Sequence, residues 1–277
     1  MPDITADLFG AVAGIHAMDL PRTTVSPPFD GLLGAFYTKL VSTSEADPAW
    51  FVQHAGPPEG DVLELCCGGG RTAIAFARTG RRVTAVDLST LQLAAAEKRA
   101  AENGVSELVT WVHADVTGLD LGRTYSTIVI AGLSITLFDG PARDALLAVA
   151  RRHLSPGGRI LFDHTPVRAG EVTAEQTISL PVVLGERRGF VLVAGRRIPE
   201  ENLQFTNMYA ELIDGDGHTR RHLTGFRFRI DTADGLAEQL AGHRLVVKDR
   251  HQDPSAWAAT GPTPFAAREL VVAQSAS

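Results

Sequence analysis

An acidic residue inside an apolar run, followed by consecutive glycines, is the part of this sequence best suited to chemistry. Residues 64–74 read LELCCGGGRTA, so Glu64 lies between apolar neighbours, and Gly68 and Gly70 follow two cysteines. Glycines after a strand let the backbone approach a ligand without clashes from Cβ atoms. A carboxylate beside such a loop could bind a positively charged group. The stretch therefore predicts a ligand-binding loop at the end of a strand.

Two further acids end apolar runs. Asp87 ends the run VTAVD, and the residues between Gly70 and Asp87 are enough for one helix. A carboxylate at this point of an open α/β sheet can accept hydrogen bonds from both hydroxyls of a ribose. Asp115 ends the run VTWVHAD and could accept a hydrogen bond from an adenine amino group. The three acids together predict a cofactor that contains a nucleoside.

Alternating strands and helices are needed to bring these acids to one edge of a sheet. The apolar runs 61–66, 81–88, 108–115, 126–132 and 159–164 predict strands, and 71–80, 89–104 and 142–154 predict helices between them. This alternation is typical of βαβ units, which form a parallel sheet covered on both faces. Ligands of such sheets bind at the carboxyl ends of the strands. The short runs 177–184, 189–195, 203–213 and 218–230 then predict antiparallel strands, with a hairpin turn at 213–218.

The glycine loop also permits a second interpretation. Gly68, Gly70 and Ala73 fit the pattern G-x-G-x-x-A of dinucleotide-binding folds. Against it, Glu64 occupies a strand position that is normally apolar there, and no second nucleotide-binding half follows residue 164. A nicotinamide-dependent oxidoreductase is therefore a lower-ranked alternative. A third alternative is a module that binds the cofactor without catalysis.

Five segments in order and spacing resemble the successive motifs of class I S-adenosylmethionine (SAM) dependent methyltransferases. They are VLELCCGGG, VTAVDLS, VTWVHADV, STIVIAGLSI and LSPGGRILFD, and the resemblance covers roughly residues 58–164 and the last pair of strands. It implies a doubly wound, Rossmann-like seven-stranded sheet, with antiparallel strands inserted after the fifth strand and added to one end of the sheet. It also implies SAM as the cofactor. Cys66 replaces the first glycine of the family's first motif. This departure is tolerable if Cys66 keeps a negative φ, but it could reshape the methionine pocket.

The resemblance also implies a division of the chain into four segments. Residues 1–57 would be a helical lid or substrate segment, and residues 58–165 the SAM-binding core. Residues 166–230 would be the insertion, which covers the acceptor pocket or pairs two copies of the chain. Residues 231–277 would return a helix and two strands to the core sheet. The stretch 254–264 has no assigned role.

The cofactor-binding residues follow from the resemblance, position by position. The set is Tyr37, Glu64, Cys66, Cys67, Gly68, Gly70, Arg71, Asp87, Leu88, Asp115, Val116, Ala131 and Gly132. Glu64 would lie near the methionine moiety, Asp87 would hold the ribose, and Leu88 would pack on the adenine. Simpler alternatives remain open, because Glu64 could cap the glycine loop and Asp87 the following helix. The adjacent cysteines predict small-residue packing rather than a redox pair or a metal site.

The acceptor has to be inferred from less specific features. Methyl transfer from SAM is an in-line displacement, for which a protein mainly supplies proximity and alignment. The candidate catalytic residues are His164, Tyr37 and Tyr209. We expect His164 to face the acceptor and Asp163 to be tied to backbone donors, while Tyr209 and Glu211 share one face of a strand. A small natural product or peptide, methylated on an amine nitrogen, is the expected acceptor, with methylation on oxygen or carbon as the alternative.

Composition limits the partners that we expect. The net charge of −6 and the pI of about 5.8 argue against a nucleic-acid or anionic-membrane surface. No apolar run approaches the roughly twenty residues of a membrane span. With only two cysteines, which are adjacent, a reducing cytoplasmic setting is expected. No metal is expected, and a homodimer through the insertion is possible.

Overall fold

A computed structural model describes residues 4–34, 36, 46–252 and 268–276 of the chain. These residues form two compact units. The core unit takes its residues from 46–167, 231–252 and 268–276, and the second unit from 4–36 and 168–230. The stretch 254–264 lies outside the described residues.

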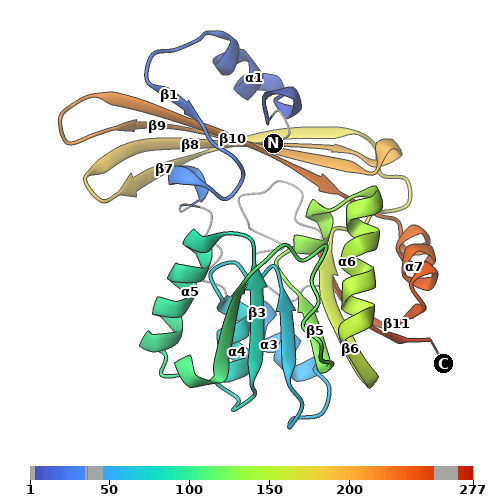
Figure 1. Cartoon of the computed structure of the whole chain (residues 1–277). Coiled ribbons are helices and arrows are strands. Elements are labelled where there is room, and N and C mark those ends of the chain that lie inside the picture. The colour runs from blue at the N-terminus through green and yellow to red at the C-terminus, as the bar shows by residue number, and fades with distance from the viewer. Residues whose placement is uncertain (1–3, 35, 37–45, 253–267, 277) are drawn as a thin grey trace. The chain divides into compact units, whose positions relative to one another are not determined.

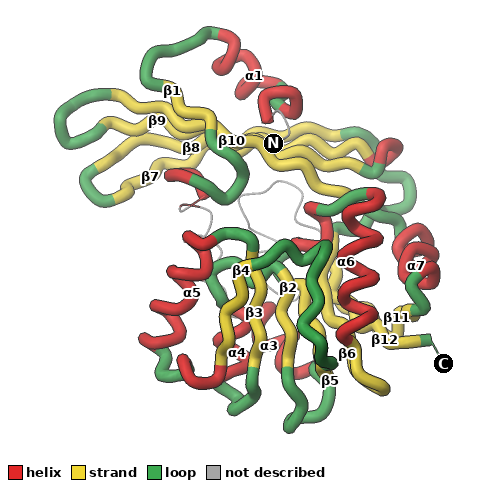
Figure 2. The backbone as a smooth tube through the Cα atoms, viewed as in Figure 1, coloured by secondary structure: helices red, strands yellow, loops and turns green. Residues whose placement is uncertain are grey.

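The core unit is built on a seven-stranded sheet with the order β11-β12-β6-β5-β2-β3-β4 (Figures 1 and 2). Strands β2 to β6 pair in parallel, whereas β12 and β11 are antiparallel to their neighbours. The strands are β2 (Val62–Leu65), β3 (Val83–Asp87), β4 (Val109–His113), β5 (Tyr125–Ile130), β6 (Leu154–His164), β11 (Leu245–Gln252) and β12 (Glu269–Ser275). The predicted fold class, a doubly wound α/β sheet of seven strands, is confirmed.

Helices cover both faces of this sheet (Figure 2). They are α3 (Ala46–His54), α4 (Arg71–Ala77), α5 (Thr90–Glu102), α6 (Gly140–His153) and α7 (Ala233–Gly242), with short 3-10 turns η2 (Ser106–Leu108) and η3 (Ser134–Leu137). One core packs against α6 and α7 and includes Ile160 and Phe162 of β6, while the other packs against α3, α4 and α5 and includes Leu161. Because side chains alternate along a strand, Asp163 continues the α3 side and His164 the α6 side.

The second unit contains a five-stranded sheet with the order β1-β10-β9-β8-β7. Its elements are η1 (Ile4–Asp7), α1 (Gly10–Ala17), β1 (Thr23–Val25), β7 (Ala174–Leu184), β8 (Arg187–Ile198), η4 (Pro199–Glu201), β9 (Leu203–Ile213) and β10 (Thr219–Arg229). The predicted hairpin turn is present, since the amide of Asp214 donates to the carbonyl of His218 at 2.9 Å.

The inserted strands do not extend the core sheet, contrary to the prediction that they add to one end of it. They pair with one another and with β1, which forms a separate sheet. Each face of this sheet has its own apolar cluster, one with Leu33 and Met208 and the other with Phe9 and Tyr209. The N-terminal residues therefore complete the inserted sheet. No described helix has the length and apolar character needed to span a membrane.

Candidate functional site

The glycine loop leaves β2 through a series of left-handed residues. Cys66, Gly68 and Gly70 have φ values of 61°, 50° and 74°. The condition of a negative φ at Cys66 is therefore not met. The loop turns there so that the amide of Cys67 can donate to the carbonyl of Val86 in β3, at 3.0 Å. The sequence at Cys66 departs from glycine, but the backbone keeps the conformation that glycine favours.

Two of the glycines have different roles. A Cβ atom added to Gly68 would meet no heavy atom within 4 Å, so this part of the loop borders open space. A Cβ atom added to Gly70 would lie 2.6 Å from the Trp111 ring and 2.8 Å from Cβ of Ala96. Gly70 therefore lets the loop pack against α5 and β4, whereas Gly68 leaves room for a ligand.

The carboxylate of Asp87 holds this loop. Its Oδ2 accepts a hydrogen bond from the amide of Gly68 at 2.7 Å, and its Oδ1 accepts one from Ser89 at 2.9 Å. Ser89 is itself the N-cap of α5, because its Oγ accepts from the amide of Gln92 at 3.3 Å. The adjacent Leu88 is 68% exposed, as expected for an apolar side chain that packs on an adenine ring. Asp87 thus joins the ends of β2 and β3.

Glu64 is almost completely buried, and burial raises its pKa to about 8. The charge of Arg71 and a hydrogen bond from the Ala73 amide act in the opposite direction but do not outweigh burial. Since Ala73 lies in the first turn of α4, whose N-cap Gly70 has no capping side chain, the carboxyl also caps that helix. Its Oε2 has no hydrogen-bond partner among the described residues. Capping therefore uses only part of the carboxyl.

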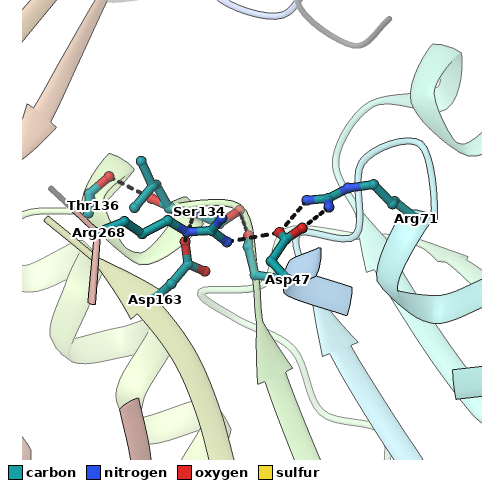
Figure 3. Close-up of polar contacts among 8 residues, drawn as sticks. Asp47, Arg71, Ser134, Thr136, Asp163 and Arg268 are labelled. Atoms are coloured by element: carbon teal, nitrogen blue, oxygen red, sulfur yellow. Dashed lines mark hydrogen bonds and ion pairs between the residues drawn. The ribbon is translucent and has the colours of Figure 1, made fainter. Parts of the chain in front are cut away.

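An ionic network connects the glycine loop to the far strands of the sheet (Figure 3). Arg71 donates to both carboxylate oxygens of Asp47 in α3, with Nη2 at 2.6 Å from Oδ2. Arg268, just before β12, places Nη2 at 2.9 Å from Asp47 and Nε at 2.6 Å from Oδ2 of Asp163. Burial alone would raise the pKa of Asp47, but the hydrogen bond from Arg71 and the charge of Arg268 hold it below its usual value.

Sequence reasoning missed Asp47 and Arg268. Neither residue lies in a recognisable motif, and they are far apart in the chain. Asp47 could have been noticed as an acid in the first turn of a short helix. Arg268 carries no such signal, because its role depends on the register between β6 and β12.

The loop after β5 lies at the point where the strand order reverses, which is where open α/β sheets bind ligands. Gly132 and Leu133 both have positive φ, at 71° and 61°. The amide of Leu133 donates to Oδ2 of Asp163 at 2.7 Å, and the hydroxyl of Ser134 donates to the carbonyl of Ala131 at 2.7 Å. The hydrogen bond from the Leu133 amide agrees with the prediction that backbone groups donate to Asp163.

Asp115 and Val116 lie just beyond the end of β4, which is paired with β3 so that His113 faces Asp87. Oδ1 of Asp115 accepts from the amide and the hydroxyl of Thr117, and these bonds lower its pKa. Asp115 is exposed, whereas Val116 is buried in the core. The structure thus places the ends of β2, β3 and β4 along one edge, as the sequence predicts.

The candidate catalytic residues lie in different surroundings. His164 is fully buried, and its Nε2 lies 2.9 Å from Oε2 of Glu269. Its Nδ1 has no hydrogen-bond partner among the described residues. The catalytic role of His164 stays a prediction. Tyr209 is buried beneath α1 in the second unit, and its hydroxyl donates to Glu211 at 2.7 Å, which confirms their shared face. Tyr37 lies outside the described residues.

Burial raises the pKa of both Cys66 and Cys67. Their thiols are therefore protonated, and they pack as small side chains in the two cores. Within the described part of the chain, no three His, Cys, Asp or Glu side chains form a group that could hold a metal ion.

The geometry fits SAM on two observations. The unpartnered Oε2 of Glu64 lies at the glycine loop, where a positively charged amino-acid group could approach it. The open space beside Gly68 and the exposed Leu88 border the carboxylate of Asp87, which could accept the ribose hydroxyls. These residues would hold the methionine and nucleoside parts of the cofactor.

Comparison with known proteins agrees with this assignment. Residues 62–158 match the family model described as a methyltransferase domain. The ubiquinone biosynthesis O-methyltransferase of Pseudomonas savastanoi pv. phaseolicola is 26% identical over 113 residues, which are 41% of this chain and 47% of that protein. The mitochondrial enzyme of the same description from Schizosaccharomyces pombe is 30% identical over 102 residues, or 36% of each chain. This chain thus spans about half the length, or less, of these curated relatives.

Solved structures match over a greater length. The glycopeptide N-methyltransferase MtfA, in complex with S-adenosyl-L-homocysteine, is 29% identical with a TM-score of 0.55, covering 83% of this chain and 89% of that one. The sugar N-methyltransferase KedS8 from Streptoalloteichus sp. is 19% identical with a TM-score of 0.67, covering 87% and 92%, and shows the shared fold alone. The family match, the strand order and the glycine loop together show that this chain carries a class I SAM-dependent methyltransferase domain.

Proposed function

We propose that this chain transfers the methyl group of SAM to an amine nitrogen of a small natural product or peptide. A solved N-methyltransferase structure that is 29% identical to this chain supports nitrogen. The similarity to the glycopeptide N-methyltransferase covers 83% of the chain, and therefore includes part of the inserted sheet as well as the core. The similarity to the ubiquinone O-methyltransferases covers 41% of the chain or less in the two cases above.

Methyl transfer from SAM requires the protein mainly to position the cofactor and the acceptor. SAM supplies a methyl group that its sulfonium has already activated. The chain has to hold the cofactor by the Glu64 and Asp87 carboxyls, align the acceptor beside Ala131 and Gly132, and exclude water from the reacting atoms. An amine that arrives neutral needs no base. The complete burial of His164 supports an acceptor that needs no base.

The proton of the product amine also needs a destination. A secondary or tertiary amine formed at neutral pH carries the proton itself and can leave as an ammonium ion. Methylation of a hydroxyl, the activity in the names of the ubiquinone relatives, would instead require a general base.

The test compares matched acceptors. The full chain is incubated with SAM and a panel of amines, phenols, indoles and short peptides, and the products are weighed by mass spectrometry. We expect a gain of one methyl group on amines, and none on the same compounds after N-acetylation. Methylation that survives N-acetylation, or that occurs on phenols alone, would contradict the proposal.

A further inference from the structure

The cofactor-binding motifs do not explain the ionic network around Arg268 (Figure 3). Two carboxylates, Asp47 and Asp163, and two guanidinium groups, Arg71 and Arg268, lie together on the α3 side of the core sheet. Asp47 and Asp163 are 1% and 0% exposed. Each carboxylate contacts Arg268, so this one side chain connects α3 to the end of β6.

The sheet register explains how Arg268 reaches Asp163. Leu270 of β12 lies opposite Asp163, and Glu269 lies opposite His164. Arg268 comes two residues before Leu270 and therefore points to the same face. A long side chain at this diagonal position can reach a partner on the neighbouring strand. The contact is thus built into the pairing of β12 with β6.

Asp163 in turn holds the loop after β5, which the proposed function places beside the reacting atoms. Its Oδ2 accepts hydrogen bonds from both Nε of Arg268, at 2.6 Å, and the amide of Leu133, at 2.7 Å. Gly132 and Leu133 are consecutive residues in the left-handed region, and Leu133 is a large residue in a conformation that favours glycine. The hydroxyl of Thr136 bonds within the loop, to the carbonyl of Leu133 at 2.5 Å. The contact with Asp163 ties this strained loop to β6.

We propose that Arg268 is a positioning residue for methyl transfer, which acts through Asp163 to fix the Leu133 amide and the Ala131–Gly132 edge of the site. A buried carboxylate without a cationic partner takes up a proton or turns toward other donors. Proton uptake would weaken the hydrogen bond from the Leu133 amide, and rotation of the carboxylate would break it. Arg268 touches neither cofactor nor acceptor in this scheme, and its effect on rate rests on the proposed function.

Amide exchange tests the structural half of the inference without any acceptor. Hydrogen–deuterium exchange of the peptide covering residues 129–137 is compared in the wild type, Arg268→Gln and Arg268→Lys. The control is Arg159→Gln, because Arg159 lies on the same face of β6 and donates to the carbonyl of His54 at 3.0 Å, away from the loop. We expect at least about tenfold faster exchange in Arg268→Gln, an intermediate effect in Arg268→Lys, and no change in the control.

Kinetics tests the functional half. With saturating SAM, Arg268→Gln should lower the single-turnover rate at least about tenfold, while SAM affinity changes less than about threefold. Arg268→Lys should recover part of the rate. If Arg268→Gln does not fold, Arg268→Lys, which keeps the charge but loses the Nε contact with Asp163, should show a smaller effect of the same kind.

The outcomes separate the two proposals. Unchanged exchange of residues 129–137 in folded Arg268→Gln would overturn the inference, whatever the wild type methylates. An equal loss of SAM affinity and rate would also overturn it, because the residue would then serve cofactor binding. A wild type that methylates no amine would overturn the proposed function, while the exchange experiment would still decide the role of Arg268.

Discussion

Burial keeps the carboxyl of Glu64 protonated at neutral pH in the cofactor-free protein, since its pKa is raised from 4.5 to about 8. The unfolded chain releases this proton near its ordinary pKa, whereas the folded chain retains it up to about 8. Between these values the unfolded state binds fewer protons, so the free energy of unfolding falls as the pH rises. An acid that costs stability is typical of a site that serves a ligand.

Glu64→Gln keeps the neutral shape and removes this pH dependence. We expect its stability to match the wild type near pH 5 and to exceed it near pH 8 by an amount on the order of 2–4 kcal/mol. Urea unfolding of both proteins between these pH values measures the difference. Asp163 is present in both proteins, so its own raised pKa cancels. A stability difference that stays constant with pH would contradict the burial argument.

Substitutions at Cys66 test the backbone conformation of the glycine loop rather than ligand binding. A left-handed residue with a Cβ atom is strained by roughly 1–2 kcal/mol relative to glycine. We expect Cys66→Gly to be more stable than Cys66→Ala by about 1 kcal/mol in urea unfolding. The same pair of substitutions at Cys67, which is not among the residues with positive φ, should show the ordinary order, with alanine at least as stable. Alanine ahead of glycine at position 66 would show that the left-handed turn is not retained.

At the scale of elements, the loop between β2 and α4 contains one glycine expected to serve ligand binding, Gly68, and one that serves packing, Gly70. Gly70→Ala would force a Cβ atom to 2.6 Å from Trp111, so we expect a loss of about 2–4 kcal/mol in stability. Gly68→Ala places its Cβ atom in open space and should cost about 1–2 kcal/mol for its backbone alone. Calorimetry with S-adenosyl-L-homocysteine should then show at least about tenfold weaker binding for Gly68→Ala. An unchanged affinity in Gly68→Ala would show that the open space beside Gly68 is not part of the cofactor site.

The elements of the core could be predicted because their signals are local. The strands from β2 to β6 are apolar runs bounded by turn residues, and the helices between them have caps such as Ser89. The three residues of β1, Thr23–Val25, show no such pattern, since the strand exists only through its pairing with β10. Arg268 has the same limitation, because its contact with Asp163 depends on the register of β12 against β6.

At the scale of the whole molecule, the units do not follow the order of the chain. The N-terminal residues share a unit with the inserted strands, and Phe9 and Val12 pack in the same cluster as Tyr209. The local sequence of residues 4–17 does not indicate that these residues pack against strands almost two hundred residues away. The shared edge formed by the ends of β2, β3 and β4 could be predicted, because these strands follow one another in the sequence. The pairing of N-terminal residues with the inserted sheet could not, because it depends on distant packing.

The measurement that tests the central claim most directly is the position of the transferred methyl group. The full chain is incubated with SAM labelled with ¹³C in its methyl group and with the amine identified by the acceptor panel, and the product is examined by NMR. We expect the labelled carbon on nitrogen, with one S-adenosyl-L-homocysteine formed for each methyl group transferred. A label on oxygen or carbon, or cofactor turnover without a labelled product, would contradict the proposal that this chain methylates an amine nitrogen.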